Sequence, residues 1–209
     1  MKNIQGDLKQ KLKSEATKAK ILEAARIELA SKGYAGFRIS NIATIAGVSK
    51  GALTHHFESK EHLIKQLIGC IYEVEKEESF KRLDELSGDN ILDHLIDDFC
   101  YYYLGDTFKI SISLLSLEEY EPELHRDISK ITREFRLVIE EKWFEKLHEF
   151  GLSDHDAKTI LSLSQTMLRG IKMRLYLVDD KAYIKFTLDE WKKMLRQLFP
   201  ILNTEKEEL

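Results

Sequence analysis

Hydrophobic residues recur along most of the chain at the spacing of one face of an α-helix. Few stretches alternate as a β-strand does, and the chain has only two prolines and ten glycines. The pattern predicts helices over residues 17–32, 39–46, 50–56, 60–86, 90–104, 106–120, 122–150, 154–178 and 188–202. We therefore predict an all-α protein of about nine helices, with an N-terminal three-helix head joined by a long helix to a C-terminal helical bundle.

Two of the predicted helices are short and meet at a tight turn. The first has one apolar face, formed by Ile39, Ile42, Ala43 and Ala46. Gly47 can adopt the positive φ that ends a helix, and the hydroxyl of Ser49 can cap the helix that follows. Leu53 and Phe57 anchor that second helix inward. Two short helices joined in this way indicate a helix-turn-helix motif that spans Arg38 to Phe57.

The second of these helices and its flanks present small residues and hydrogen-bond donors, which suit the base edges and phosphates of a DNA groove. The candidate DNA-binding residues are Arg38, Ser49, Lys50, Gly51, Ala52, Thr54, His55, His56 and Lys60. We expect Lys50 and Lys60 to hold phosphates, and the others can contact phosphates or bases. A helix, a glycine and a capped helix also occur in all-α proteins that bind no DNA, so this pattern alone leaves both interpretations open.

The order of residue types favours the DNA-binding interpretation of this motif. The chain carries Gly33–Tyr34, Ile42–Ala43, the run AGVSKG from Ala46 to Gly51, His55–Phe57 and a closing Lys60. Over residues 17–71 this order and spacing resemble the TetR family of bacterial transcriptional regulators. The chain departs from the family at Phe37 and Arg38, where two threonines or serines are usual, and at Thr54, where a tyrosine is usual. Because the departures remove a helix cap and an aromatic phosphate contact, we interpret them as shifts in operator preference.

The resemblance implies a ligand-responsive, homodimeric regulator, more often a repressor, which binds a palindromic operator in double-stranded DNA and is released by a small-molecule effector. It also implies that the last two long helices, residues 154–178 and 188–202, pair with their counterparts in a dimer. Both helices carry wide apolar stripes, formed by Ile160, Leu161, Leu163, Met167, Leu168, Ile171, Leu175 and Tyr176 and by Trp191, Met194, Leu195, Leu198 and Phe199. A large intramolecular core is the alternative explanation of these stripes.

We expect four segments along the chain: a flexible leader over residues 1–16, a helix-turn-helix DNA-binding domain over 17–62, a ligand-binding and dimerisation domain over 63–202, and a disordered tail over 203–209. The leader is either a solvated tail or an arm that reaches phosphates. A turn at residues 87–90 precedes one helix of the larger domain, and a capping box of Thr187 and Glu190 begins its last helix.

The charge distribution supports this division. Residues 1–60 hold eleven Lys and Arg against five Asp and Glu, a net charge of +6. The rest of the chain holds 21 against 31, a net charge of −10, so that the two parts sum to the −4 of the whole chain. A positive head on an acidic body is typical of a DNA-binding module attached to a domain that does not touch DNA.

The larger domain gathers aromatic, thioether and cationic residues that could line an effector pocket. The candidate ligand-binding residues are Phe99, Tyr102, Tyr103, Phe108, Trp143, Met167, Arg169 and Met173. An arginine in such a pocket would favour an aromatic or amphipathic ligand with an anionic group. These aromatics could instead simply fill the helical bundle.

Other classes of function find little support in the sequence. No spacing of His, Cys, Asp or Glu suggests a metal site, and no nucleophile motif or phosphate-binding glycine loop is present, so we expect no catalytic residues, metal or cofactor. A small helical enzyme is therefore a weak alternative, and a structural DNA-binding protein that senses no ligand is a nearer one. No apolar run is long enough to span a membrane, and the N-terminus lacks a signal-peptide core, so we expect a cytoplasmic protein with reduced Cys70 and Cys100.

Overall fold

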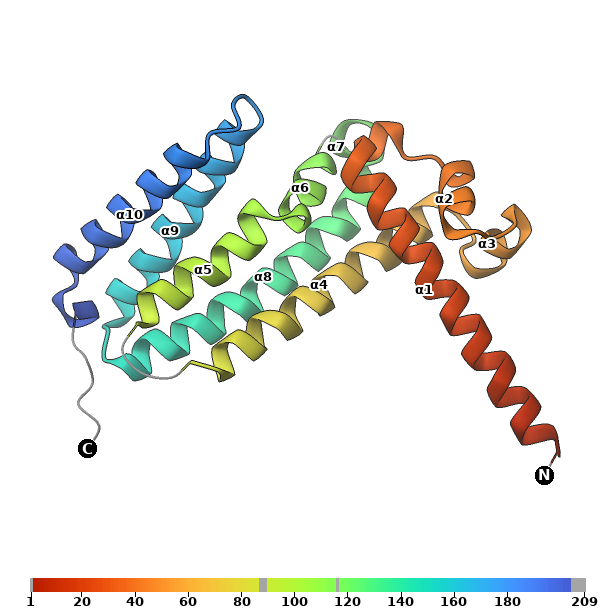
Figure 1. The fold of residues 1–209 in the computed structure, drawn as a ribbon, viewed down its shortest axis with the longest axis horizontal. Coiled ribbons are helices and arrows are strands. Elements are labelled where there is room, and N and C mark those ends of the chain that lie inside the picture. Colours follow the sequence, from red (N-terminus) through yellow and green to blue (C-terminus); the bar gives the residue numbers. More distant parts are fainter. Residues whose placement is uncertain (1, 87–89, 116, 204–209) are drawn as a thin grey trace. The chain divides into compact units, whose positions relative to one another are not determined.

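The computed structural model describes residues 2–86, 90–115 and 117–203, and their side chains from Gly6 onward. Over these ranges the chain forms ten α-helices, one short 3-10 helix and no strand (Figure 1). The helices are α1 (Lys2–Gly36), α2 (Ile39–Ala46), α3 (Lys50–His56), α4 (Lys60–Asp84), α5 (Ile91–Leu104), α6 (Asp106–Ser113), α7 (Leu117–Tyr120), α8 (Pro122–Phe150), α9 (Asp154–Leu175), α10 (Lys181–Leu198) and the 3-10 helix η1 (Pro200–Asn203). The all-α prediction is confirmed.

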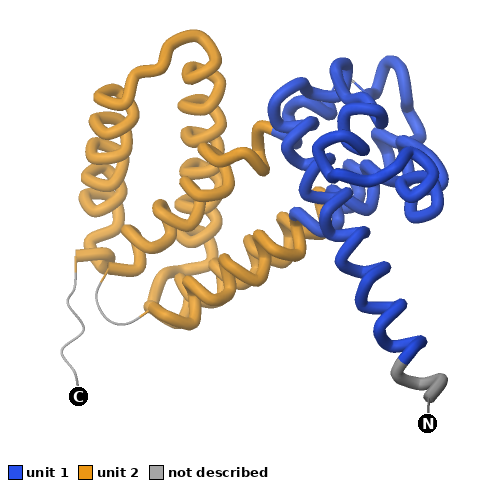
Figure 2. The backbone as a smooth tube through the Cα atoms, turned by 45° about the vertical axis from the view of Figure 1, so that its right-hand side comes forward, with its two compact units in different colours: residues 1–71, 110–131 blue, residues 72–109, 132–209 orange. Residues whose placement is uncertain are grey.

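The chain divides into two compact units (Figure 2). Unit 1 comprises residues 1–71 and 110–131, so it contains α1, α2, α3, the first part of α4, the end of α6, α7 and the start of α8. Its buried apolar side chains include Ile21, Ala25, Leu29, Phe37, Ile42, Leu53, Phe57, Leu63, Ile64, Leu67 and Ile68. Because α4 supplies four of these side chains, the unit extends beyond the boundary that we expected after residue 62. Three short helices alone would bury too little apolar surface to be stable.

Helix α1 begins at Lys2, whereas we expected a flexible leader over residues 1–16 and a helix only from Thr17. The leader is rich in lysine, glutamine and leucine, which are good helix formers, and it holds no proline that would stop a helix. The side chains of residues 6–16 are all exposed. Near the other end of α1, Gly33 has a φ of 62° and interrupts the helical geometry, as expected of the glycine stop.

Unit 2 comprises residues 72–109 and 132–209 and is built around α5, α9 and the second half of α8. Its buried apolar side chains include Leu92, Leu95, Ile96, Phe99, Trp143, Leu147, Ala157, Ile160, Leu168 and Leu195. Helix α5 ends against a side chain of α9, because the Lys172 ammonium donates hydrogen bonds to the carbonyl oxygens of Leu104 at 2.7 Å and Gly105 at 3.0 Å. A cation at the carboxyl end of a helix also complements the helix dipole.

Two predicted helices differ clearly from the structure. The expected helix over residues 106–120 is divided into α6 and α7 by a turn at Leu114 and Leu115. The last long helix begins at Lys181 rather than at residue 188, because the Asp180 carboxylate caps it by accepting from the Tyr183 amide at 2.9 Å. The expected capping box at Thr187 is therefore wrong, since that residue lies inside α10.

Two other expectations fall partly outside the described residues. The turn expected at residues 87–90 overlaps residues 87–89, and the disordered tail expected at 203–209 overlaps residues 204–209, so neither stretch is described there. Asn90 precedes α5 at the N-cap position, and Asn203 belongs to η1. Cys70 is exposed and Cys100 is half-buried, and the two are not joined by a disulfide in the described structure.

Candidate nucleic-acid interface and ligand pocket

The turn between α2 and α3 has the geometry that its residues predict. Gly47 adopts the left-handed conformation, with φ 65° and ψ 35°, and its amide donates to the carbonyl oxygens of Ala43 and Thr44. The next amide, that of Val48, donates to Ala43 at 3.0 Å, which completes the helix stop. The Ser49 hydroxyl then accepts from the Ala52 amide at 3.1 Å and caps α3. The helix-turn-helix geometry is therefore fixed by backbone bonds and one side-chain cap.

The outer side of this motif carries most of the predicted DNA-binding residues. The exposed ones are Arg38, Ser49, Lys50, Gly51, Thr54 and His55, and the half-buried ones are Ala52, His56 and Lys60. Arg38 occupies the N-cap position of α2 and forms no side-chain cap there, as its departure from the family pattern implies. The Thr54 hydroxyl donates back to its own helix, 3.1 Å from the carbonyl oxygens of Lys50 and Gly51. It therefore presents its methyl group and its oxygen lone pair more readily than a donor.

Lys60 differs from Lys50 in its surroundings. Its ammonium lies 3.7 Å from the centroid of the Tyr34 ring, and the Tyr34 hydroxyl donates to the Glu121 carboxylate at 2.7 Å. Burial disfavours the charged amine and lowers the pKa of Lys60. Burial, with the hydrogen bond to Glu121, raises the pKa of Tyr34. Lys60 would have to leave this ring to reach a phosphate, whereas Lys50 is exposed at the start of α3.

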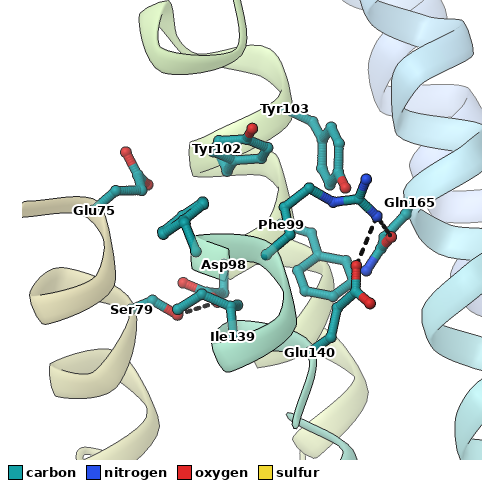
Figure 3. Close-up of a pocket in the computed structure, with 11 residues that line it drawn as sticks. Glu75, Ser79, Asp98, Phe99, Tyr102, Tyr103, Ile139, Glu140 and Gln165 are labelled. Atoms are coloured by element: carbon teal, nitrogen blue, oxygen red, sulfur yellow. Dashed lines mark hydrogen bonds and ion pairs between the residues drawn. The ribbon is translucent and has the colours of Figure 1, made fainter. Parts of the chain in front are cut away.

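A pocket in unit 2 lies among α4, α5, α8 and α9 (Figure 3). Its lining combines aromatic, aliphatic and polar side chains: Glu75, Ser79, Asp98, Phe99, Tyr102, Tyr103, Phe135, Arg136, Ile139, Glu140 and Gln165. An apolar wall with a few polar groups is typical of a small-molecule site.

Asp98 joins three elements by hydrogen bonds at one end of the pocket. Its carboxylate accepts hydrogen bonds from the Ser79 hydroxyl, the Arg82 guanidinium and the Trp143 indole, each at 2.7 Å. Asp98 is 4% exposed and Trp143 is 1% exposed. Glu75 stands nearby, 3.8 Å from Arg82, and it accepts from the Thr107 hydroxyl at 3.0 Å. Burial raises the pKa of Glu75, because its charge is only partly compensated by these two neighbours.

The other end of the pocket is rich in donors. The Arg136 guanidinium donates to Glu140 at 2.7 Å and to Gln165 at 3.1 Å, while its Nε atom is buried without a hydrogen-bond partner among the described residues. Arg169 donates to the Tyr103 hydroxyl at 3.1 Å and to Gln165 at 3.4 Å, and it forms no ion pair within the described ranges. The buried Nε donor of Arg136 and the uncompensated charge of Arg169 therefore lie beside the pocket.

The structure brings together only some of the predicted pocket residues. Phe99, Tyr102 and Tyr103 line the cavity. Phe108, Trp143 and Arg169 stand behind that lining, in contact with Tyr102, Phe99 or Tyr103. Met167 is half-buried away from the lining, and Met173 is 54% exposed on the outer side of α9. These two methionines therefore lie outside the lining of this cavity, because residues spaced along α9 point around its axis and only some of them face α5.

The sequence analysis missed the charged members of the pocket. Asp98 had a readable signal, since Leu95, Phe99 and Tyr102 place it within the apolar stripe of α5. A carboxylate in such a stripe is buried only when it is paired. Arg136 and Glu140 are four residues apart on α8, a spacing that also occurs on solvated helices, so they carried no comparable signal.

The stripes of the last two long helices divide between a core and an exposed face. Ile160, Leu161, Leu168, Ile171 and Leu195 are buried within unit 2. The exposed apolar side chains of this region are Leu163, Met173, Tyr176, Leu177, Val178, Phe186, Met194 and Leu198. Helix α10 buries only Leu195 fully and is otherwise tied down by polar contacts, such as that of Lys192 with Asp93 at 2.8 Å. The buried residues thus fit the intramolecular core that we considered for these stripes, and the exposed residues are candidates for a surface that contacts a second protomer.

Comparisons with known proteins agree with this geometry. The family model for "Bacterial regulatory proteins, tetR family" matches residues 21–67, which run from α1 into α4. The transcriptional regulator CymR of Pseudomonas putida is 37% identical over 166 residues, which cover 79% of this chain and 82% of CymR. The chain belongs to the TetR family. The predicted resemblance is thereby confirmed. The N-terminal helix-turn-helix of this chain is the DNA-binding domain of a TetR-family transcriptional regulator.

Solved structures extend the likeness of fold over most of the chain. A transcriptional regulator from Rhodococcus sp. Rha1 superposes with a TM-score of 0.66 at 18% identity, over 86% of this chain and 96% of that one. FadR from Bacillus subtilis, solved in complex with stearoyl-CoA, superposes with a TM-score of 0.56 at 19% identity, over 89% of this chain and 97% of that one. In the described part of this TetR-family protein, no helix is both long and apolar enough to cross a membrane.

Proposed function

We propose that this TetR-family protein is a homodimeric transcriptional repressor, which binds a palindromic operator and leaves it when a small molecule occupies the pocket of unit 2. The observation that carries the proposal is the exposed, capped helix α3, which presents Lys50, Gly51, Thr54 and His55 to solvent. At 1.5 Å per residue this helix is about 10 Å long, which suits the major groove. In a dimer, two such helices would read half-sites about 34 Å apart.

Within this proposal, Lys50 contacts a phosphate and the other exposed residues of α3 read or frame the bases. Lys50→Ala should therefore weaken binding to operator and non-operator DNA by similar factors. The slope of log affinity against log salt should fall by about 0.9 for each lost contact, hence by about two in a dimer. The measurement is a fluorescence-anisotropy titration at several salt concentrations, on an operator obtained by selection from random DNA.

Lys32→Ala provides the matched control, because Lys32 is an exposed lysine of unit 1 outside the helix-turn-helix. Its salt slope should equal that of the wild type. A wild-type protein that selects no sequence from random DNA would refute the proposed function. Equal slopes for the wild type and Lys50→Ala would remove only Lys50 from the phosphate contacts.

We further propose that the effector is an aromatic or amphipathic molecule with an anionic group. Phe99, Tyr102 and Phe135 offer rings to its body. The buried Nε of Arg136 and the uncompensated charge of Arg169 would favour a carboxylate over an ammonium group at the other end. Occupation of the pocket would favour a conformation in which the two DNA-binding heads no longer match the operator spacing. The FadR structure contains a bound acyl-CoA, which supports a ligand-responsive role for this fold.

Ligand binding can be tested with matched compounds in a thermal-shift assay. An aromatic carboxylate should raise the melting temperature, whereas the corresponding amide and amine should raise it much less. Arg169→Gln should reduce the shift caused by the carboxylate by at least about half, which corresponds to losing one charge-assisted hydrogen bond. Arg133→Gln removes an exposed arginine of α8 and should leave the shift unchanged. Stabilisation by amines only, or equal shifts in both variants, would contradict an anionic effector.

A further inference from the structure

The N-terminal half of α1 projects from unit 1 without burying any described side chain. Ile21 is the first buried residue of the helix, and the side chains of residues 6–16 are all exposed. From residue 6 to residue 21 the helix advances about 22 Å at 1.5 Å per residue. Over residues 6–16 this helical segment gains nothing from packing in the described structure, so its surface is available to a partner.

Three lysines of this segment form one stripe. At 100° per residue, Lys9, Lys13 and Lys20 fall within about 40° of one another around the helix axis. Asp7 and Glu15 lie about 120–160° away from them. No ion pair or side-chain hydrogen bond of these three lysines occurs in the described part of the chain, and like charges four residues apart repel each other. The lysine stripe is therefore an uncompensated row of positive charge.

Two hydrogen bonds of α1 show which way the lysine stripe faces. Glu28 accepts from the Asn41 amide of α2 at 2.9 Å, and Lys18 donates to Gln66 of α4 at 3.4 Å. Around the helix axis the lysine stripe lies about 80° from Glu28 and about 160° from Lys18. It thus lies at about a right angle to the face that meets α2 and is turned away from α4. Helix α2 leads directly into α3, the candidate recognition helix (Figure 1).

We propose that the lysine stripe of α1 binds the phosphate backbone of double-stranded DNA beside the half-site that α3 contacts. The proposal rests on the proposed DNA-binding function and adds a second contact surface to it. A row of positive charge about 16 Å long, from Lys9 to Lys20, can lie along the phosphates of a duplex strand. These unpaired lysines offer their charge to a polyanion, whereas Asp7 and Glu15 lie on the opposite side of the helix and Glu23 is paired with Arg26.

The test compares Lys9→Gln/Lys13→Gln with Lys11→Gln. Lysine and glutamine have similar helix propensities, so neither variant should change the fold. Lys11 is four residues from both Asp7 and Glu15 and lies on the opposite side of α1, which makes it the matched control. With four lysines removed per dimer, the salt slope for an operator duplex with long flanks should fall by about 3.6, and Lys11→Gln should keep the wild-type slope.

A second measurement uses the length of the DNA. Trimming the base pairs that flank the two half-sites should lower the wild-type slope by more than it lowers the slope of the double variant, which keeps only Lys20 of the stripe. Equal slopes for the wild type and Lys9→Gln/Lys13→Gln would overturn the proposal, as would an equal loss in Lys11→Gln. In either case, binding that still depends on Lys50 would leave the proposed regulatory function intact. A wild-type protein that binds no DNA would overturn both.

Discussion

Replacing Asp98 by alanine should destabilise the protein by about 3–5 kcal/mol, because it leaves buried donors and a charge without their partner. The Asp98 carboxylate accepts from Ser79, Arg82 and Trp143 at once. The Trp143 indole cannot reach water after the substitution, since that side chain is 1% exposed. Arg82 is 25% exposed and can recover part of its hydration, which keeps the loss within this range.

Chemical denaturation followed by circular dichroism measures this loss. Asp97→Ala is the matched control, because Asp97 is the adjacent residue on α5 but its side chain is 67% exposed, 3.3 Å from Lys192. An exposed ion pair of this kind contributes less than about 1 kcal/mol. Asp98→Asn should fall between the two, since an amide oxygen still accepts from Trp143 and Ser79. If Asp98→Ala and Asp97→Ala had the same stability, the buried network would not have the role that we assign to it.

Leu163→Glu/Leu198→Glu should convert the proposed dimer to monomers and weaken operator binding by about 10²-fold or more. Leu163 is 47% exposed on α9 and Leu198 is 64% exposed on α10, so both can be changed without disturbing the core of unit 2. In a two-fold interface each substitution would bury two carboxylates, one from each protomer, at a cost of several kcal/mol. A monomer binds one half-site and loses the gain in affinity from linking two heads.

Sedimentation velocity and operator titrations measure the two effects on the same samples. Leu137→Glu is the control, because Leu137 is 56% exposed on α8, outside the two helices of the proposed interface. Leu168 is unsuitable for this experiment, although it belongs to the stripe predicted from sequence, because it is fully buried and its replacement would unfold unit 2. An intact dimer in the double variant would place the interface elsewhere.

Sequence patterns predicted only some of the residues that line the candidate pocket. Phe99, Tyr102 and Tyr103, which were predicted as ligand-binding residues, are close in sequence and all line the cavity. Met173, which was also predicted, lies outside the lining, and Arg136, Gln165 and Glu75 line the cavity without having been predicted. Their position in the pocket depends on the packing of α4, α8 and α9 against α5, and no local spacing encodes that packing.

The sequence by itself determined the helix-turn-helix and the family, because the signals for both are local. Gly47 ends one helix, Ser49 caps the next, and the order of residue types around them lies within one short stretch. Only the tertiary structure decided that Lys60 rests on the Tyr34 ring, that residues 110–131 belong to unit 1, and that Asp98 joins three donors. Each of these contacts joins residues from elements that are separate in the chain, and they form only when apolar faces pack together and bury the polar groups between them.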